Sequence, residues 1–349
     1  MKKKFLCLFL GIWLCLSFSL PLYALDGTIN ADDNAELVRP TLEITDTPGN
    51  AFAVARSLDT NMTYYYRVDG EHIWADSNED FYEPGWMPET NYIDGVIGDD
   101  DRERVSTQEG PFSAIAMLEI FFPQGNVQLG TATMISPNAA FTAAHNLYCR
   151  ELGGWAVHIK VTPGIYGWAS SPTNPFGYTS VRELVISVPA FEDETENDGV
   201  DCDWGLIRLN MDLGNRSGFL GFQFRNNSFT NHSVMISGYP LDLNFLAETY
   251  NQYMHIGTID SDNYFAITVN YEIFENRIFT YDIDATGGQS GSPILYFNNG
   301  AYQIIGIHTA GSGYNLGDDD AENDVYTHNL GFGITSELYG FLYAYKYAS

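Results

Sequence analysis

Short apolar runs, each bounded by turn residues, make up most of the chain between residues 112 and 307. Runs of this length suit β-strands, and the 23 tyrosines, 22 phenylalanines and 33 glycines of the chain favour strands and turns over helices. The pattern therefore predicts an all-β protein. The expected strands cover residues 112–122, 128–135, 139–145, 158–161, 181–188, 203–209, 234–239, 250–259, 264–269, 278–282, 294–297 and 302–307.

One segment near the C-terminus has a different periodicity. Leu338, Phe341, Leu342 and Tyr345 follow the i, i+3, i+4, i+7 spacing of one helix face. A Gly- and Asn-containing joint at 214–218 separates the strands before it from the strands after it, which gives two groups. We therefore expect two antiparallel β-barrels closed by a C-terminal helix. In this division the N-terminal barrel covers about 96–215, the C-terminal barrel about 216–334 and the helix 335–346.

The first 24 residues have the features of a secretory signal peptide. Lys2, Lys3 and Lys4 form a basic start, residues 5–20 an apolar core, and residues 21–24 a cleavage site that ends in a small residue. The apolar core could also anchor the chain in a membrane, but it is short for a span and no stop-transfer flank follows. We expect a secreted protein that has no membrane contact after signal cleavage.

Residues 25–95 are polar and acidic. Between residues 26 and 94, 15 Asp and Glu residues accompany only Arg39, Arg56 and Arg67. The segment has too few apolar residues for a sizeable core of its own. We therefore predict a pro-segment or flexible leader, followed by the functional domain at 96–349.

The formal net charge of −29 excludes nucleic acids and anionic membrane surfaces as partners, because both would repel this chain. Two acidic loops, 192–198 and 318–324, could bind a structural Ca²⁺ ion through clustered carboxylates. Neither loop has the ligand spacing of an EF-hand, and solvation of the charged side chains is the simpler explanation. We expect no cofactor.

Residues 286–293 read Thr-Gly-Gly-Gln-Ser-Gly-Ser-Pro, which places a hydroxyl between glycines. The hydroxyl of Ser290 could act as a nucleophile, and the backbone N–H groups of Gly288 and Ser290 could form an oxyanion hole. A glycine-rich hairpin loop would have the same sequence. The catalytic interpretation therefore needs a histidine and an acid elsewhere in the chain.

Two earlier segments supply these groups. His145 ends the run Thr-Ala-Ala-His, and Asp203 begins the apolar run Asp-Trp-Gly-Leu-Ile. Taken singly, the first could be a structural histidine and the second one more of the chain's 45 acidic residues. The order histidine, aspartate, serine is nevertheless that of the chymotrypsin arrangement, in which the first barrel supplies base and acid and the second the nucleophile.

Two cysteines remain after removal of the signal peptide. Cys149 follows His145 by four residues, and Cys202 precedes Asp203 by one. An even pair in a secreted protein predicts a disulfide, which here would hold the base and its acid close together.

Four motifs together resemble the bacterial glutamyl endopeptidases. They are Thr-Ala-Ala-His145, Asp203-Trp-Gly-Leu-Ile, Gly-Gly-Gln-Ser290-Gly-Ser-Pro and Gly-Ile-His308-Thr-Ala-Gly311. Members of that family are secreted, chymotrypsin-like serine peptidases that cleave after glutamate and less well after aspartate. The resemblance implies that His145 is the general base and acid, that Asp203 orients its imidazole, and that Ser290 is the acylating nucleophile. It also implies Gly288 and Ser290 as the oxyanion donors.

The resemblance further implies a substrate site. His308 corresponds to a histidine that contacts the carboxylate of the substrate's P1 side chain, and the backbone from Thr309 to Gly311 would pair with the substrate as an added strand. The staphylococcal member of the family has a pocket threonine five residues before the nucleophile. Ala285 occupies that position here, so the pocket would use the adjacent Thr286.

Residues 96–102 resemble the mature N-terminus of the staphylococcal member, where processing frees a valine α-amine that helps bind the P1 acid. We therefore expect an activating protease to cleave between Gly95 and Val96, which makes 25–95 a removable propeptide.

We predict a secreted serine endopeptidase that acts on polypeptides after Glu, and less well after Asp, through an acyl-enzyme. A peptidase of different P1 specificity is the nearest alternative, because specificity depends on His308 and its neighbours. A secreted binding protein on the same scaffold that no longer cuts is an alternative from another class, although base, acid, nucleophile and oxyanion glycines are all present. We expect a monomer without a metal ion.

Overall fold

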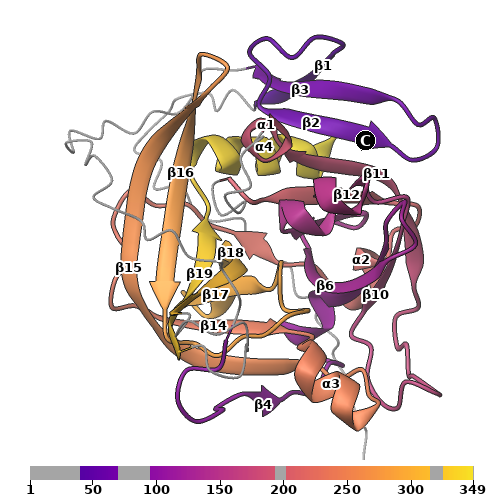
Figure 1. The fold of residues 1–349 in the computed structure, drawn as a ribbon, viewed down its shortest axis with the longest axis vertical. Helices are drawn as coiled ribbons and strands as arrows, with labels where there is room; N and C mark the ends of the chain where they lie inside the picture. Colours follow the sequence, from indigo (N-terminus) through magenta and orange to yellow (C-terminus); the bar gives the residue numbers. More distant parts are fainter. Residues whose placement is uncertain (1–39, 70–94, 193–201, 315–324, 349) are drawn as a thin grey trace, which may run out of the picture.

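The computed structural model describes residues 40–69, 95–192, 202–314 and 325–348, and strands dominate these ranges (Figure 1). The predicted signal peptide and nearly all of the two acidic loops lie outside them. The strands are β1 (Thr41–Thr45), β2 (Ala53–Ser57), β3 (Thr63–Asp69), β4 (Glu103–Arg104), β5 (Ile115–Phe121), β6 (Val127–Met134), β7 (Ala139–Thr142), β8 (Tyr148–Cys149), β9 (Gly154–Trp155), β10 (His158–Pro163), β11 (Thr179–Ser187), β12 (Gly205–Leu209), β13 (Gly221–Phe222), β14 (Ser233–Gly238), β15 (Tyr253–Val269), β16 (Glu272–Tyr281), β17 (Pro293–Asn298), β18 (Ala301–Tyr314) and β19 (Val325–Gly333). The α-helices are α1 (Val188–Glu192), α2 (Gly214–Ser217), α3 (Leu241–Ala247) and α4 (Ser336–Tyr347).

The first sheet closes into a barrel because its last strand pairs back onto an inner one. The strand order is β1-β3-β2-β11-β10-β5-β6-β7-β12, and β12 also pairs with β11. The strands from β11 to β12 in this order therefore form a ring, and β1, β3 and β2 extend the sheet beside β11. All of these pairings are antiparallel, as hairpin-connected strands favour.

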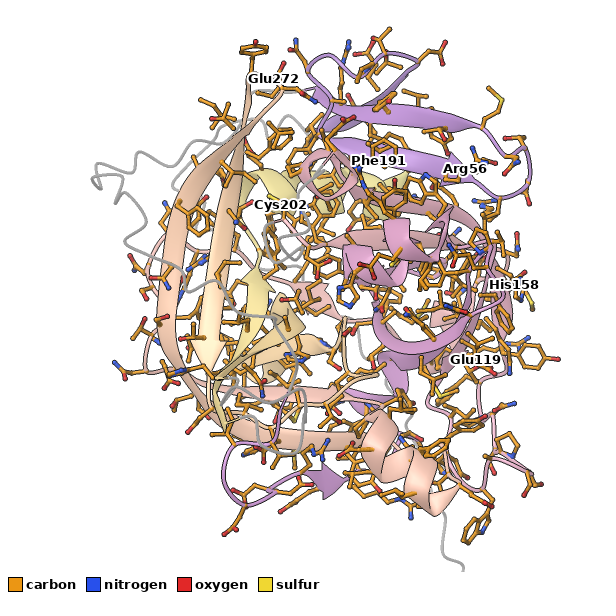
Figure 2. The ribbon with its side chains drawn as sticks, viewed as in Figure 1. Arg56, Glu119, His158, Phe191, Cys202 and Glu272 are labelled. Carbon is orange, nitrogen blue, oxygen red and sulfur yellow. The ribbon has the colours of Figure 1, made fainter. Side chains whose placement is uncertain are left out.

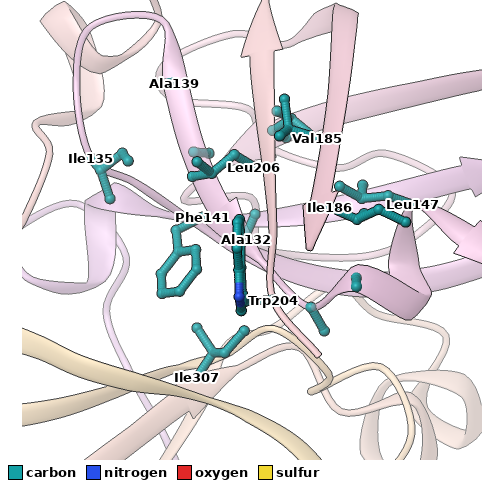
Figure 3. Close-up of a cluster of buried hydrophobic side chains, with 14 of the residues drawn as sticks. Ala132, Ile135, Ala139, Phe141, Leu147, Val185, Ile186, Trp204, Leu206 and Ile307 are labelled. Atoms are coloured by element: carbon teal, nitrogen blue, oxygen red, sulfur yellow. The ribbon is translucent and has the colours of Figure 1, made fainter. Parts of the chain in front are cut away.

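The second sheet follows the order β13-β18-β17-β14-β15-β16-β19, and β19 also pairs with β18, so that the strands from β18 to β19 form a second ring. One buried hydrophobic cluster spans both barrels, and a second cluster lies within the second barrel alone. Ile307 of β18 belongs to the same buried cluster as Phe141 of β7 and Trp204, which precedes β12 (Figure 3). The prediction of two antiparallel barrels is therefore confirmed.

The segment before residue 70 contributes to this core. Ala53, Val54 and Ala55 of β2 are completely buried, and β2 pairs with β11 from Ser187 to Glu183. Within the described residues 41–69, the prediction of a flexible leader is therefore wrong. The physical reason is that these strands need no core of their own, because they bury their apolar side chains against the first barrel. Removal of the segment by cleavage stays a prediction.

A buried carboxylate joins the same segment to the barrel and to the C-terminal helix. Glu183 of β11 accepts hydrogen bonds from the hydroxyls of Tyr64, Tyr66 (2.6 Å) and Tyr345 (2.7 Å). Tyr64 and Tyr66 lie on β3 and Tyr345 on α4, and Figure 1 shows these elements at one end of the molecule. Three donors on one carboxylate satisfy a charge that burial would otherwise make costly.

Two of the predicted strands, 250–259 and 264–269, are one strand in the structure. The polar residues between them suggested a turn, but β15 continues through them in register with β16, with one bulge between Ile259 and Ser261. Asp262 is held inside the sheet because it forms a bidentate ion pair with the buried guanidinium of Arg277, at 2.8 and 2.6 Å.

The predicted C-terminal helix is confirmed as α4. The hydroxyl of Thr335 caps it by accepting from the N–H of Leu338 (3.2 Å), and Leu338, Phe341, Leu342 and Tyr345 are completely buried, as their spacing predicts. Among the described residues, no helix is long and apolar enough to span a membrane.

The first turn of α4 contains a carboxyl group that should be sensitive to pH. Burial of the Glu337 carboxyl, together with the nearby charge of Glu275, raises its pKa to about 7. Because the folded state binds this proton more tightly than the unfolded state, the contribution of the group to stability decreases as the pH rises from about 4.5 to about 7. We expect Glu337→Gln to stabilise the protein by ~1–2 kcal/mol at pH 8 and to have little effect at pH 5.

Urea unfolding of both proteins at the two pH values measures this difference. Glu109→Gln, at an exposed position, serves as the control and should change the unfolding free energy by the same small amount at both pH values. An effect of Glu337→Gln that does not depend on pH would contradict the expectation.

Candidate active site

The structure brings the predicted base and acid into direct contact. β7 ends at Thr142, and a single 3₁₀ turn, Ala144–Asn146, presents the imidazole of His145. Asp203 lies just before β12, and its Oδ2 is 2.7 Å from Nδ1 of His145 while its Oδ1 accepts the backbone N–H of His145 (3.0 Å). The Asp203 side chain is 4% exposed and that of His145 41%. A buried carboxylate thus orients a half-exposed imidazole and places the proton of the ring on Nδ1.

The residue after the histidine connects this pair to the serine loop. The side-chain amide of Asn146 donates to the backbone carbonyl of Ser290 (2.8 Å), and the N–H of Thr131 on β6 donates to the same carbonyl (2.9 Å). Ser290 is therefore tied to the turn that carries His145, across the junction of the two barrels. Asn146 was not among the predicted site residues, although its position next to His145 could have indicated it.

The loop from Thr286 to Gly291 depends on its glycines. Gly288 has a φ of +93°, and a Cβ there would lie 2.5 Å from the carbonyl oxygen of Tyr239. Gly291 has a φ of +85°, and a Cβ there would lie 2.2 Å from the carbonyl oxygen of Thr131. Side chains are thus excluded both by conformation and by space.

The backbone of this loop leaves N–H groups available for a ligand. The N–H groups of Gln289 and Gly291 donate to the carbonyls of Thr286 (3.0 Å) and His308 (2.8 Å). Within the described part of the chain, the N–H groups of Gly288 and Ser290 donate to no carbonyl or side chain. These are the two groups predicted to hold an oxyanion.

His308 is completely buried on β18, and its backbone N–H donates to the carbonyl of Ser292 (2.8 Å), two residues after the predicted nucleophile. Its Nδ1 lies 2.7 Å from the hydroxyl of Tyr281, which donates its own proton to the carbonyl of Leu330 (2.7 Å). The tyrosine oxygen must therefore accept from Nδ1, which fixes the ring orientation and one of its protons.

The strand that follows His308 has an open edge. β17 pairs with β18 only as far as Ile307, whereas β19 continues to pair with Ala310 and Gly311. Among the described strands, none pairs with residues 309–311 on the edge opposite β19. This geometry suits the predicted addition of an extended peptide as a further strand.

The predicted mature N-terminus lies close to the same strands. Asn329 of β19, the partner of Gly311, accepts the N–H of Gly95 (3.2 Å) and donates to its carbonyl (2.8 Å). The N–H of Ile97 donates to the buried carboxylate of Asp284 (2.8 Å). Val96 is therefore held beside the strands that carry the predicted substrate residues.

Thr286, which was predicted to line the substrate pocket, makes hydrogen bonds to two charged side chains. Its hydroxyl donates to Asp242 (2.5 Å) and accepts from Arg102 (2.8 Å), so that it belongs to an ion cluster around the buried guanidinium of Arg102. Hydrogen bonds from Arg102 also lower the pKa of Asp100 in this cluster. Arg102 and Asp242 were not predicted, because nothing in an acidic stretch of sequence marks which charges will be buried.

The predicted disulfide is not formed in the structure. The Sγ of Cys202, which is labelled in Figure 2, donates to the carbonyl of Glu275 on β16 (3.7 Å), and the backbone N–H of Cys202 donates to Asn276 (3.3 Å). Cys149 lies on β8, in the separate β8–β9 ribbon. Contact between the acid and the base instead relies on the hydrogen bonds of Asp203 itself.

One group of side chains within the described ranges could hold a metal ion. Asp101, His255 and Asp284 each offer one ligand atom, and these atoms lie within 4.8 Å of one another. The oxygens of Asp284 already accept the N–H groups of Ile97 and Asp101, and Nδ1 of His255 accepts the N–H of Asp284 (2.9 Å). The group shares no residue with the site around His145.

Comparison with known proteins places this arrangement in a family. A family model described as Trypsin matches residues 105–328. The extracellular metalloprotease of Bacillus subtilis is 33% identical over 238 residues, which cover 67% of this chain and 68% of that protein. The glutamyl endopeptidase of Bacillus licheniformis is 30% identical over 235 residues, which cover 64% and 65%. This chain thus spans about two thirds of the length of both relatives.

The fold agrees with that assignment. The structure of a Glu endopeptidase in complex with MPD superposes with a TM-score of 0.56 at 26% identity, and the match covers 72% of this chain and 100% of that one. The family match includes both barrels and the three residues that the sequence order identified, His145, Asp203 and Ser290. The chain therefore belongs to the trypsin family of serine endopeptidases.

Proposed function

We propose that this protein is a secreted serine endopeptidase that cleaves polypeptides after Glu, and less efficiently after Asp. The observation that carries the proposal is the 2.7 Å contact between His145 and Asp203, on a turn that Asn146 ties to the carbonyl of Ser290. The proposal is also supported by the relative from Bacillus licheniformis, which is 30% identical to this chain and is named glutamyl endopeptidase.

The proposed reaction proceeds in two halves. His145 removes the proton from the Ser290 hydroxyl as its oxygen attacks the scissile carbonyl carbon, and the resulting oxyanion is held by the N–H groups of Gly288 and Ser290. The C–N bond then breaks, and His145 gives the proton to the leaving amine. In the second half, water attacks the ester carbon of the acyl-enzyme while His145 takes a proton from that water. The ester C–O bond to Ser290 then breaks, the carboxylic product leaves, and His145 returns the proton to the Ser290 oxygen.

Specificity is proposed to depend on His308 and the open strand edge that follows it. The ring of His308 is fixed by Tyr281, and an imidazole beside a carboxylate has its charged form favoured. An acidic P1 side chain would therefore be bound better than a neutral one of equal size. The extended substrate would pair with the backbone of residues 309–311.

We further propose that an activating protease cleaves the secreted precursor between Gly95 and Val96, and that the enzyme acts as a monomer. The fixed position of Gly95 on Asn329 supports this site, because cleavage there would release a new α-amine beside the strands that bind the substrate.

One preparation tests these proposals. The secreted protein is purified, its N-terminus is sequenced, and it is assayed on peptides that differ only at P1, with Glu, Asp, Gln, Lys or Phe. We expect the N-terminus of the secreted protein to be Val96. We also expect a kcat/KM for Glu at least ~10-fold above that for Gln, because the neutral Gln side chain offers the pocket no carboxylate to bind. A fluorophosphonate probe should label this protein but not its Ser290→Ala variant.

Ser261→Ala, at another half-buried serine, is the matched control and should be labelled like the wild type. A best substrate with Gln, Lys or Phe at P1 would favour the peptidase of different specificity. Absence of labelling in a correctly processed wild type would favour the non-catalytic binding protein.

A further inference from the structure

Arg102 is buried at the junction of three segments. Its side chain is 1% exposed, and its guanidinium forms bidentate pairs with Asp100, at 2.9 and 2.8 Å, and with Asp242, at 3.1 and 2.6 Å. Asp242 lies on α3, which follows β14 of the second barrel, whereas Arg102 and Asp100 come from the segment before the first barrel. A planar fork of five donors suits this double pairing, which a lysine ammonium could not reproduce.

The same guanidinium also reaches the loop that carries the nucleophile. Nη1 of Arg102 lies 2.8 Å from Oγ1 of Thr286 and 3.4 Å from Oε1 of Gln289. Oε1 of Gln289 in turn accepts the N–H of Thr286 (3.1 Å). Arg102 therefore holds both ends of the turn 286–289, whose third residue is Gly288.

The two carbonyl groups inside this turn also accept hydrogen bonds. The N–H of Leu241 donates to the carbonyl of Gly287 (2.7 Å), and the hydroxyl of Thr131 donates to the carbonyl of Gly288 (2.8 Å). The orientation of the Gly288 N–H is thus set by contacts to both carbonyls and by the Arg102 cluster at the two ends of the turn.

We propose that Arg102 is a positioning residue for the oxyanion hole: its buried guanidinium, paired with the partly exposed Asp100 and Asp242, holds the Thr286–Gln289 turn so that the N–H of Gly288 points at the developing oxyanion. The inference rests on the proposed peptidase function. An oxyanion donor stabilises the transition state only when it is oriented before the reaction, and small displacements of such a donor are costly. Arg102 itself contacts neither substrate nor reacting atoms.

This role separates kcat from KM. Oxyanion contacts form in the tetrahedral state and not in the ground-state complex, so that loss of their alignment lowers kcat and leaves KM nearly unchanged. A peptide aldehyde probes the same contacts directly, because the Ser290 oxygen adds to its carbonyl carbon and the resulting hemiacetal oxygen occupies the oxyanion hole.

The test compares Arg102→Met with Arg277→Met. Arg277 is also buried and also forms a bidentate pair, with Asp262, but it lies on β16, outside the serine loop. For Arg102→Met we expect kcat to fall about 100-fold, on the order of the effect of one lost oxyanion donor, with a parallel loss of aldehyde affinity and a KM within about threefold of wild type. Arg277→Met should lose stability but keep kcat and aldehyde affinity. Arg102→Lys should recover only part of the loss.

Thr286→Val provides a second test that leaves the ion cluster charged and removes only the hydroxyl between Arg102 and the turn. We expect a loss of kcat and of aldehyde affinity of about tenfold, equal for Glu and Asp at P1, from one charge-assisted hydrogen bond. A change confined to KM or to P1 preference would instead assign Thr286 to the substrate pocket and overturn the inference.

Wild-type kcat and aldehyde affinity in both Arg102→Met and Thr286→Val would also overturn it. If Arg102→Met does not fold, Thr286→Val alone decides. A wild-type enzyme that hydrolyses no peptide and reacts with no fluorophosphonate would instead refute the proposed function, and the inference with it.

Discussion

Asp203→Asn should lower kcat by about four orders of magnitude. This is the loss that the wrong tautomer of the catalytic histidine causes in the chymotrypsin triad. The geometry explains why an amide cannot replace this carboxylate. One oxygen of Asp203 accepts the backbone N–H of His145, so the amide oxygen must take that position. The amide nitrogen then faces Nδ1, donates to it, and drives the imidazole proton to Nε2. The base can no longer accept the serine proton.

Steady-state hydrolysis of a Glu-containing peptide measures this effect, and urea unfolding verifies that the variant is folded. Asp262→Asn is the matched control, because Asp262 is also a buried carboxylate in a short ion pair, but with Arg277. We expect that control to lose stability and to retain kcat. A kcat for Asp203→Asn within tenfold of wild type would show that Asp203 does not determine the tautomer of His145.

In the uncleaved chain, Phe341→Ala should destabilise the protein by about 3–5 kcal/mol, the usual cost of removing a large aromatic side chain from a core. Phe341 is completely buried on α4, and its ring centroid lies 5.2 Å from that of Phe52, 5.5 Å from Trp204 and 6.0 Å from Tyr66. These rings come from the N-terminal segment, the first barrel and the helix. Little backbone can close around the cavity, because three separate elements meet there.

Denaturant unfolding monitored by tryptophan fluorescence checks this value. Phe245→Ala on α3 makes the same chemical change on a helix, but at a side chain that is 75% exposed. It should change the unfolding free energy by less than about 0.5 kcal/mol. Equal effects of the two substitutions would mean that the N-terminal segment and α4 do not pack together in solution.

Local sequence pattern predicted those features that depend on short-range physics. The spacing of Leu338, Phe341, Leu342 and Tyr345 predicted a helix, and alternating apolar runs predicted the barrel strands, because a strand or helix must present one apolar face to the core. The predicted turn at 260–263 was wrong for the complementary reason. Polar residues favour turns only when no buried partner, such as Arg277 for Asp262, is available in the fold.

The candidate site was predictable in part. Glycines around a serine, and the order histidine, aspartate, serine, were enough to predict the three groups, because acyl-transfer chemistry needs those side chains whatever their spacing. The disulfide was not, because two cysteines close in sequence to the site residues can still lie in different surroundings: Cys149 is in the β8–β9 ribbon, whereas Cys202 is in a turn and its Sγ contacts β16. Arg102 was also missed, since burial of a charge is not visible in a list of charges.

The amino-acid sequence alone determined the strand content and the final helix, and it was sufficient to predict the base, acid and nucleophile. Only the tertiary structure decided which distant groups meet: Asn146 with Ser290, Arg102 with the 286–289 turn, and β2 with the first barrel. The physical reason is that periodicity reflects burial within one element, whereas hydrogen bonds and ion pairs between elements depend on how those elements pack.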